Sequence, residues 1–197
     1  MLKDVLFSLN FLKEKGFPVV KSAQVKNLQE AQRKACEFNY PVFIKIISDK
    51  IIHKAKQGFV KECVNEQDLK DKFTKMEKAA KLEDENAGIL IQEHSHGTEL
   101  ILGLKQDEVF GKVILVGSGG TLTELIKDIS FRACPINKQD AKEMLEELRI
   151  FNHLKSKEGM LEDLIVKTSQ LPVKELDINP VMVNTQSVHV VDARLIL

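Results

Sequence analysis

Apolar side chains recur every three or four residues in three stretches of the first half of the chain, which predicts three amphipathic helices. Their apolar faces consist of Leu2, Val5, Leu6, Leu9 and Leu12, then of Leu28, Ala31, Ala35 and Phe38, then of Leu69, Phe73, Met76 and Ala80. Gly16 and Pro18 end the first helix, and Asn27 with Glu30 three residues later resembles the capped start of the second.

Runs of apolar residues predict strands between and after these helices. The runs cover residues 42–47, 58–64, 88–94, 99–106, 111–117, 173–183 and 187–195, and further helices are expected near 138–150 and 160–170. We therefore predict an α+β fold of two lobes that divide near residue 86, an N-terminal lobe of residues 1–86 and a C-terminal lobe of residues 87–197. A single larger sheet is the alternative.

Composition narrows the class of protein. Hydrophobic residues make up 43% and charged residues 29%, which excludes a disordered chain. Lysine plus arginine (29) equals aspartate plus glutamate (29), so the chain lacks the basic excess that is typical of a nucleic-acid-binding protein. Residues 1–17 carry acids and lysines through their apolar positions, unlike a signal peptide, and no run of about 18 apolar residues occurs. We expect a cytoplasmic protein with no membrane association and, because its three cysteines contain no CxxC pair, reduced and mostly buried thiols.

The last two strands predict a hairpin that carries oxygen ligands. If residues 184–187 form its loop, Asn179 lies opposite Asp192, and Asp177 lies opposite Arg194. An amide oxygen and carboxylates at that separation suit Mg²⁺, which keeps water and phosphate oxygens in its remaining positions. The alternative is a polar sheet face with an ion pair and nothing bound. The proline that follows the asparagine could add a bulge and shift this register.

A local positive charge surrounds the strand at 42–47. Lys45 interrupts its apolar run, and residues 45–57 hold four lysines against one aspartate, a net charge of +3, together with His53. Such a segment is suited to phosphates, and a neutral imidazole is a good nucleophile that could accept a phosphoryl group. The alternatives are an edge strand with solvated lysines and an incidental loop histidine.

Two further features are weak by themselves. The glycine loop at 117–120 follows a strand and could bring N–H groups close to phosphate oxygens, but it lacks the lysine and spacing of a Walker motif. Gln92 and Glu93 end one strand and Glu99 begins the next, where strand backbone could pair with an adenine and a carboxylate could accept ribose hydroxyls. A tight turn with exposed acids explains these residues equally well. His94 and His96 form an HxH pair without an apparent third zinc ligand.

Five blocks occur together in one order along the chain: YPVFIKIISDKIIHKAKQGFV, ILIQEHSHGTELILGLKQDEVFGKVILVGSGG, TELIKDISFRACP, ELDINPVMV and VVDARLIL. In this order they resemble the nucleotide-binding (beta) subunits of ADP-forming acyl-CoA (acetate–CoA) synthetases. That family has the ATP-grasp fold, is related to succinyl-CoA synthetase and binds nucleotide between two α+β lobes. The resemblance extends from Lys3 to Leu197.

The resemblance implies nucleotide-binding roles for several residues. Lys45 matches the lysine that holds ATP phosphates, while Gln92, Glu93 and His94 match the hinge beside adenine. Glu99 matches the carboxylate that binds ribose. Gly119 and Gly120 belong to the matching glycine loop.

The resemblance also implies the catalytic and metal residues. His53 matches the loop histidine that relays a phosphoryl group, and Arg132 stands where a cation would face the phosphates. Asn179 and Asp192 match the Mg²⁺ ligands, with Asp177 as a third acid close by.

The implied activity is that of a ligase that interconverts acyl-CoA, ADP and phosphate with acid, CoA and ATP. ATP or ADP is the substrate nucleotide, and Mg²⁺ is the cofactor. CoA would bind on a partner (alpha) subunit, which makes a hetero-oligomer. Where the family usually reads HKSDxGGV, this chain reads HKAKQGFV, with Ala55, Lys56 and Phe59 in place of serine, aspartate and glycine. A non-catalytic ATP-binding regulatory module with a degenerate histidine loop is therefore one alternative, and an ATP-grasp ligase that acts on carboxylates without CoA is another.

Overall fold

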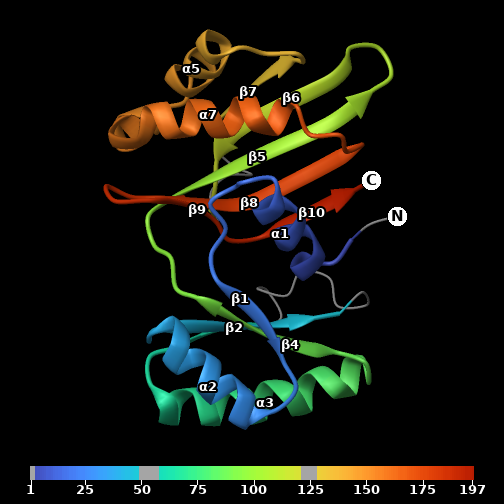
Figure 1. Cartoon of the computed structure of the whole chain (residues 1–197), viewed down its shortest axis with the longest axis vertical. Helices are drawn as coiled ribbons and strands as arrows, with labels where there is room; N and C mark the ends of the chain where they lie inside the picture. Colours follow the sequence, from blue (N-terminus) through green and yellow to red (C-terminus); the bar gives the residue numbers. More distant parts are fainter. Residues whose placement is uncertain (1–2, 49–57, 121–127) are drawn as a thin grey trace. The chain divides into compact units, whose positions relative to one another are not determined.

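The computed structural model describes residues 3–48, 58–120 and 128–197 (Figure 1). The chain forms two compact units, one of residues Val20–His94 and one that combines Met1–Val19 with Ser95–Leu197. Within the described residues, no helix has both the length and the apolar character needed to cross a membrane.

The unit Val20–His94 is a four-stranded antiparallel sheet with two helices against one face (Figure 1). Its elements are β1 (Ser22–Val25), α2 (Leu28–Phe38), β2 (Val42–Ile47), β3 (Val60–Cys63), α3 (Glu66–Glu83) and β4 (Gly88–Glu93). The sheet order is β1-β4-β2-β3. The predicted cap is present, since the Asn27 side chain accepts a hydrogen bond from the Glu30 N–H. Because β2 lies between β4 and β3, the edge-strand interpretation of Lys45 is wrong.

The second unit contains a six-stranded sheet with helices packed on one face. Its elements are α1 (Val5–Glu14), β5 (Thr98–Asp107), β6 (Gly111–Ser118), β7 (Ile129–Ala133), α5 (Lys138–Glu146), α6 (Phe151–Leu154), the 3-10 turn η1 (Lys155–Lys157), α7 (Glu158–Ser169), β8 (Glu175–Val183), β9 (Val188–Val190) and β10 (Ala193–Ile196). The sheet order is β10-β8-β5-β6-β7, and β9 also pairs with β8.

The two faces of this sheet differ in character because side chains alternate along each strand. The face against α7, which we call the helix face, carries the buried residues Leu102, Leu104, Ile114, Val116 and Leu176. The opposite face carries Ile101, Gly103, Lys105, Val113, Leu115, Phe131, Glu175 and Asp177. Most of the candidate metal-binding side chains belong to this opposite face.

The two units differ from the predicted lobes. The boundary after His94 replaces the one predicted near residue 86, because β4 pairs with both β1 and β2 and so completes the first sheet. The first 19 residues join the C-terminal part of the chain, because α1 packs on β10. The Lys3 N–H also donates to the Leu195 carbonyl at 3.0 Å.

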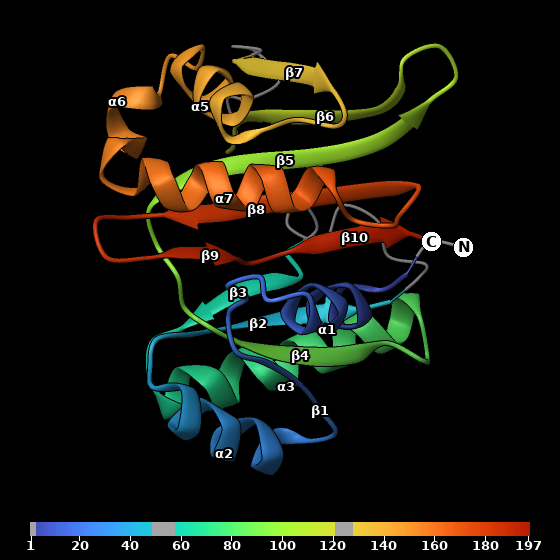
Figure 2. The same ribbon diagram turned by 45° about the horizontal axis from the view of Figure 1, so that its top comes forward.

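The closing hairpin has the predicted register. Val183 pairs with Val188, and Asp177 pairs with Arg194 where β10 continues alongside β8 (Figure 2). The bulge expected at the proline is present, but it affects the other side of β8, where the pairing with β5 shifts between Leu100 and Leu102. The pairing within the closing hairpin therefore keeps the predicted register.

Candidate nucleotide and metal site

Lys45 and Gln92 point to the same face of the four-stranded sheet. In the register of β2 with β4, Lys45 pairs with Leu90 and Phe43 pairs with Gln92. Val42, Ile44 and Ile46 alternate with them and lie in the core beneath the helices. Lys45 is half-buried, and its side chain starts from the sheet face that is not occupied by this core.

The three predicted hinge residues have different surroundings. Gln92 is completely buried, and its Nε2 donates to Ser22 Oγ at 2.9 Å. The Glu93 carboxylate turns to Lys21, accepting from its backbone N–H at 3.2 Å, with its Nζ 3.5 Å away. The Glu93 N–H already donates to the Lys21 carbonyl, so this group of the expected adenine-binding backbone is in use.

His94 lies on the same sheet face as Lys45. Its ring stacks on Phe43 with centroids 5.4 Å apart, and its Nε2 lies 3.2 Å from Glu62 Oε1. Phe43 was not singled out from the sequence, because an aromatic residue in an apolar strand gives no signal of such a contact.

In the second unit, the structure brings Glu99 together with the glycine loop. The Gly119 N–H donates to the Glu99 carbonyl at 2.7 Å, and a Cβ on Gly119 would lie 2.8 Å from the Glu99 Cβ. Gly120 has φ +92°, which favours glycine, and a Cβ there would lie 3.4 Å from the Glu99 carboxylate. Glycine is thus required where this loop crosses the start of β5.

Gly97 supports the same corner and was missed from the sequence. It has φ +147°, and a Cβ at this position would lie 2.2 Å from the Val183 carbonyl oxygen. A glycine just before a predicted strand was the available signal. Close to it, Ser95 Oγ lies 3.4 Å from His189 Nδ1, a pair on which the sequence also gave no hint.

The three candidate metal-binding residues lie close together on the closing hairpin. Asn179 is adjacent to Asp192, since its N–H donates to the Asp192 carbonyl at 3.1 Å. Asp177 lies two residues before Asn179 on the same strand and therefore on the same face. The bulge places Asn179 alongside Ile101, two residues along β5 from Glu99. The hairpin and the glycine corner thus share the opposite face of one sheet.

The electrostatics of the hairpin suit a cation. Burial raises the pKa of the Asp177 carboxyl, Arg194 acts against this rise, and the neighbouring Asp192 and Glu175 add to it. A cation bound beside this carboxyl would favour its ionised form against the cost of burial. Throughout residues 3–48, 58–120 and 128–197, no group of three or more His, Cys, Asp and Glu residues could hold a metal alone. The Asn179 amide and phosphate or water oxygens would therefore have to complete an Mg²⁺ shell.

Arg132 is not brought to this site. It pairs with Ile114 across β6 and β7, so its side chain starts from the helix face rather than from the face of Asp177. There its guanidinium forms an ion pair with Glu147, whose carboxylate also accepts from Ser130. The expectation that Arg132 faces the phosphates is therefore not met. The candidate phosphoryl acceptor His53 lies outside the described residues.

Phe59, one of the three departures in the histidine segment, lies in the core of the first unit. Only 8% of its surface is exposed. It packs in the same cluster as Ile46 and Met76, and its carbonyl accepts from the Ile46 N–H at 3.1 Å. The phenylalanine thus fixes the chain to the sheet directly after the segment that holds His53.

Comparison with known proteins identifies a family that covers almost the whole chain. The model of the ATP-grasp domain family matches residues 6–197. The chain is 36% identical to the beta subunit of Pyrococcus furiosus acetate–CoA ligase [ADP-forming] I, over 94% of this chain and 88% of that subunit. It is 38% identical to the Nitrosopumilus maritimus 4-hydroxybutyrate–CoA ligase [ADP-forming], but there it spans only 27% of the longer protein.

The fold agrees with solved structures. A structure of Ca. Korarchaeum cryptofilum dinucleotide-forming acetyl-coenzyme A synthetase 1 superposes with a TM-score of 0.91 at 30% identity, covering all of this chain and 93% of that one. That structure holds coenzyme A and Ca-AMPCP, and another of the same protein holds Mg-AMPPCP, with its phosphohistidine segment pointing towards the nucleotide binding site. The chain therefore belongs to the ATP-grasp family, and within it to the homologues of the beta subunits of ADP-forming acetate–CoA ligases.

Proposed function

We propose that this chain is the nucleotide-binding subunit of an ADP-forming acyl-CoA synthetase and works with a CoA-binding partner subunit. The observation that carries the proposal is the shared sheet face on which Asn179, Asp192 and Asp177 lie next to the corner formed by Glu99 and Gly119. Metal, phosphate and ribose contacts are required close together wherever a nucleoside triphosphate is bound for phosphoryl transfer.

Each residue has a physical role in this proposal. The Lys45 ammonium neutralises phosphate charge, the glycine-loop N–H groups donate to phosphate oxygens, and the Glu99 carboxylate accepts the ribose hydroxyls. Asn179 and Asp192 are the residues that would hold Mg²⁺, which supplies charge neutralisation at the phosphates when bound.

The proposed group transfer uses an imidazole as relay. A nitrogen of His53 attacks the γ-phosphorus of ATP, so that an N–P bond forms, the bond to the bridging oxygen breaks and ADP leaves. The phosphoryl group then passes to the carboxylate of the acid on the partner, and the thiol of CoA displaces phosphate to give the thioester. Splitting the transfer in this way replaces one difficult step by easier ones.

The metal part of the proposal is tested by nucleotide binding alone. Asp192→Asn should weaken ATP binding in the presence of Mg²⁺ by about tenfold or more, with a much smaller effect in EDTA, because the carboxylate acts through the cation. The matched control is Asp163→Asn, an exposed aspartate of α7, which should bind as the parent does. Isothermal titration measures both. Equal loss with and without Mg²⁺ would contradict the metal assignment.

The relay is tested with the CoA-binding subunit present. Incubation with γ-labelled ATP and Mg²⁺ should give an acid-labile phosphate that is absent in His53→Gln. The buried Phe59 favours the second candidate, a regulatory module, because it fixes one end of the histidine segment. Nucleotide binding without labelling would establish that alternative, and acyl phosphate formed without CoA would indicate a carboxylate ligase.

We also propose that this chain does not select the acid. Relatives named for acetate and for 4-hydroxybutyrate match it to a similar extent, at 36% and 38% identity. Assay of the assembled enzyme with a panel of acids, repeated after exchange of the partner subunit, should move the preference with the partner.

A further inference from the structure

Glu99 is the first member of a row of three side chains that crosses the opposite face of the six-stranded sheet. In the strand register, Glu99 of β5 pairs with Met182 of β8, and Met182 pairs with His189 of β9. Directly opposed residues of neighbouring strands project to the same face, with Cβ atoms about 5 Å apart. Val181 and Val190, which pair beside the row, are buried on the helix face, so the half-buried members of the row belong to the opposite face.

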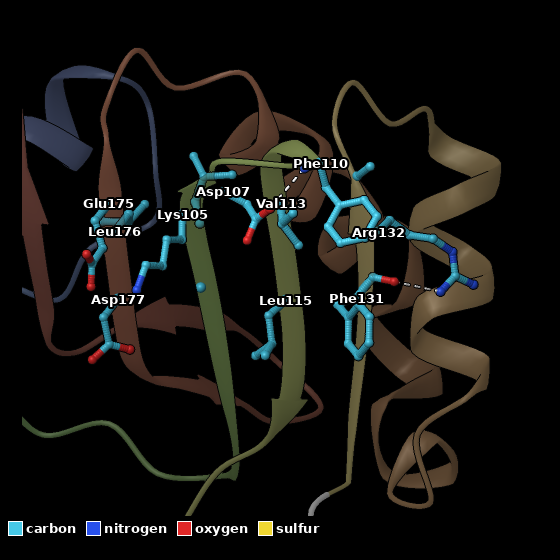
Figure 3. Close-up of a pocket in the computed structure, with 13 residues that line it drawn as sticks. Lys105, Asp107, Phe110, Val113, Leu115, Phe131, Arg132, Glu175, Leu176 and Asp177 are labelled. Carbon is cyan, nitrogen blue, oxygen red and sulfur yellow. Dashed lines mark hydrogen bonds between the residues drawn. The ribbon is translucent and has the colours of Figure 1, made fainter.

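The place of this row along the sheet determines which part of a nucleotide it meets. The metal-site residue Asn179 lies alongside Ile101, two residues along β5 from Glu99. On the far side of Asn179 from the row, Asp177 and Glu175 line a groove of about 780 Å³ (Figure 3). A nucleotide with its phosphates at Asn179 and its ribose at Glu99 therefore extends away from this groove and towards the row.

Glu99 has different neighbours on its two sides within the sheet. On the β6 side, the Gly119 N–H donates to the Glu99 carbonyl, and the proposed function gives this glycine loop to the phosphates. On the β8 side lies Met182, with His189 beyond it. Because the glycine loop occupies one side of the ribose carboxylate, the base of the nucleotide is left to the other. An apolar side chain suits the face of a base, and a polar ring suits its edge.

The chain before β5 holds the His189 ring in place. Ser95 is buried, and its Oγ lies 3.4 Å from His189 Nδ1. The next residue is fixed as well, because Asn184 Nδ2 donates to the His96 carbonyl at 2.9 Å. When the Ser95 hydroxyl donates to Nδ1 of a neutral imidazole, Nε2 carries the proton and is a donor. Nε2 is then the ring nitrogen that is available to a ligand.

We propose that His189 is a specificity-determining residue of the nucleotide site, whose Nε2–H donates to an unprotonated ring nitrogen at the edge of a purine base. The inference rests on the proposed function, which supplies the nucleotide, and goes further by naming a residue that contacts its base. From Glu99 to His189 the row covers two strand spacings, about 10 Å. A two-ring purine extends across Met182 towards His189, whereas a single-ring pyrimidine ends short of it.

Nucleotide binding by the chain tests this role. His189→Phe keeps a ring at this position and removes both nitrogens. In calorimetric titrations with Mg²⁺, the variant should bind ATP about three to ten times more weakly than the parent, because one hydrogen bond is lost. Its affinity for inorganic tripolyphosphate, which has no base, should be unchanged, which also shows that the variant folds. The matched control His153→Phe, at an exposed position of α6, should bind both ligands as the parent does.

Base preference gives a second measurement, which a purely structural role of His189 would not change. The parent should bind ATP more tightly than UTP, and His189→Phe should reduce this ratio by about three- to tenfold. Ser95→Ala, which leaves the ring but removes its anchor, should reduce the ratio less. An unchanged ratio in His189→Phe, or an equal loss of affinity for ATP and tripolyphosphate, would overturn the inference.

The two proposals can fail separately. A parent chain that does not bind ATP with Mg²⁺ would remove the proposed function. A parent that binds ATP through Asp192 and Mg²⁺, together with a His189→Phe variant of unchanged base preference, would remove only the role of His189.

Discussion

The three cysteines have three different environments. Cys63 is completely buried, Cys134 is half-buried and Cys36 is exposed on α2. The sequence-based expectation of mostly buried thiols therefore holds for Cys63 but is wrong for Cys36. Burial raises the pKa of the Cys63 thiol to about 11, and it also raises that of Cys134. Since the thiolate is the reactive form, the three should react at very different rates.

Thiol labelling at pH 8 checks this order. Cys36 should react with a chromogenic disulfide within the mixing phase, and Cys63 should react only as fast as the protein opens. Peptide mapping of partly labelled protein assigns each rate. Labelling of Cys63 in native protein at the rate of Cys36 would contradict the structure.

The ion pair that holds Arg132 on the helix face predicts a pH-dependent stability. The Arg132 guanidinium, helped by Ser130, lowers the pKa of the Glu147 carboxyl below its ordinary value of 4.5. A carboxyl with a lowered folded-state pKa stabilises the fold above its unfolded pKa and loses this contribution as the pH falls through the folded value.

Glu147→Gln should therefore lower the free energy of unfolding at pH 7, by less than about 1 kcal/mol because the pair is partly solvent-exposed. The difference from the parent should shrink below pH 4.5 and disappear at lower pH. Urea unfolding at several pH values measures it. A difference that grows as the pH falls would show that the pair is not the cause.

At the scale of elements, much of the hairpin could be predicted because side-chain alternation and loop length together fix a register. Two strands, β1 and β7, could not be predicted from the sequence. β1 has only four residues, and β7 alternates exposed and less exposed residues without an apolar run. Arg132 lies on β7, so its sheet face could not be assigned from the sequence, since the face of a side chain is unknown until its strand is known. Glu99 and Gly119 were predicted separately, but only the fold shows their contact.

The glycine before β5 gives a sharp prediction for an element boundary. Gly97→Ala should destabilise the protein by about 2 kcal/mol or more, because its φ of +147° and the nearby Val183 carbonyl leave no room for a Cβ. Gly159→Ala is the matched control, since a Cβ there meets nothing within 4 Å and alanine favours the helix by about 0.5 kcal/mol. The midpoint temperature of thermal unfolding should fall in Gly97→Ala and rise in Gly159→Ala. A Gly97→Ala protein as stable as the parent would contradict the close approach of position 97 to the Val183 carbonyl.

At the scale of the whole molecule, the first 19 residues belong to one unit, residues 20–94 form the other, and the chain then returns to the first unit. This order was not predictable from local patterns, because the packing of α1 against β10 joins the two ends of the chain. An amphipathic face shows that a helix packs, but it does not show where.

Fragments test this division. Residues 20–94 contain a complete sheet and core, so the isolated fragment should show cooperative unfolding. A fragment of residues 1–86 should not, because it lacks β4, which pairs with both β1 and β2. Residues 95–197 should gain stability when a peptide of residues 1–19 is added, because α1 then covers β10. Circular dichroism follows both. Cooperative folding of 1–86 would contradict the observed boundary.

Ser22 and Gln92 are direct cross-strand partners, so the entry and exit of the inserted unit lie side by side. An insertion with adjacent ends can be transplanted as a cassette with joints at 19/20 and 94/95. A relative's cassette with the HKSDxGGV segment, grafted into this chain, would leave the hairpin sequence of the recipient untouched. Any gain in phosphoryl transfer by such a chimera would then belong to the donor's histidine segment and its supporting lobe.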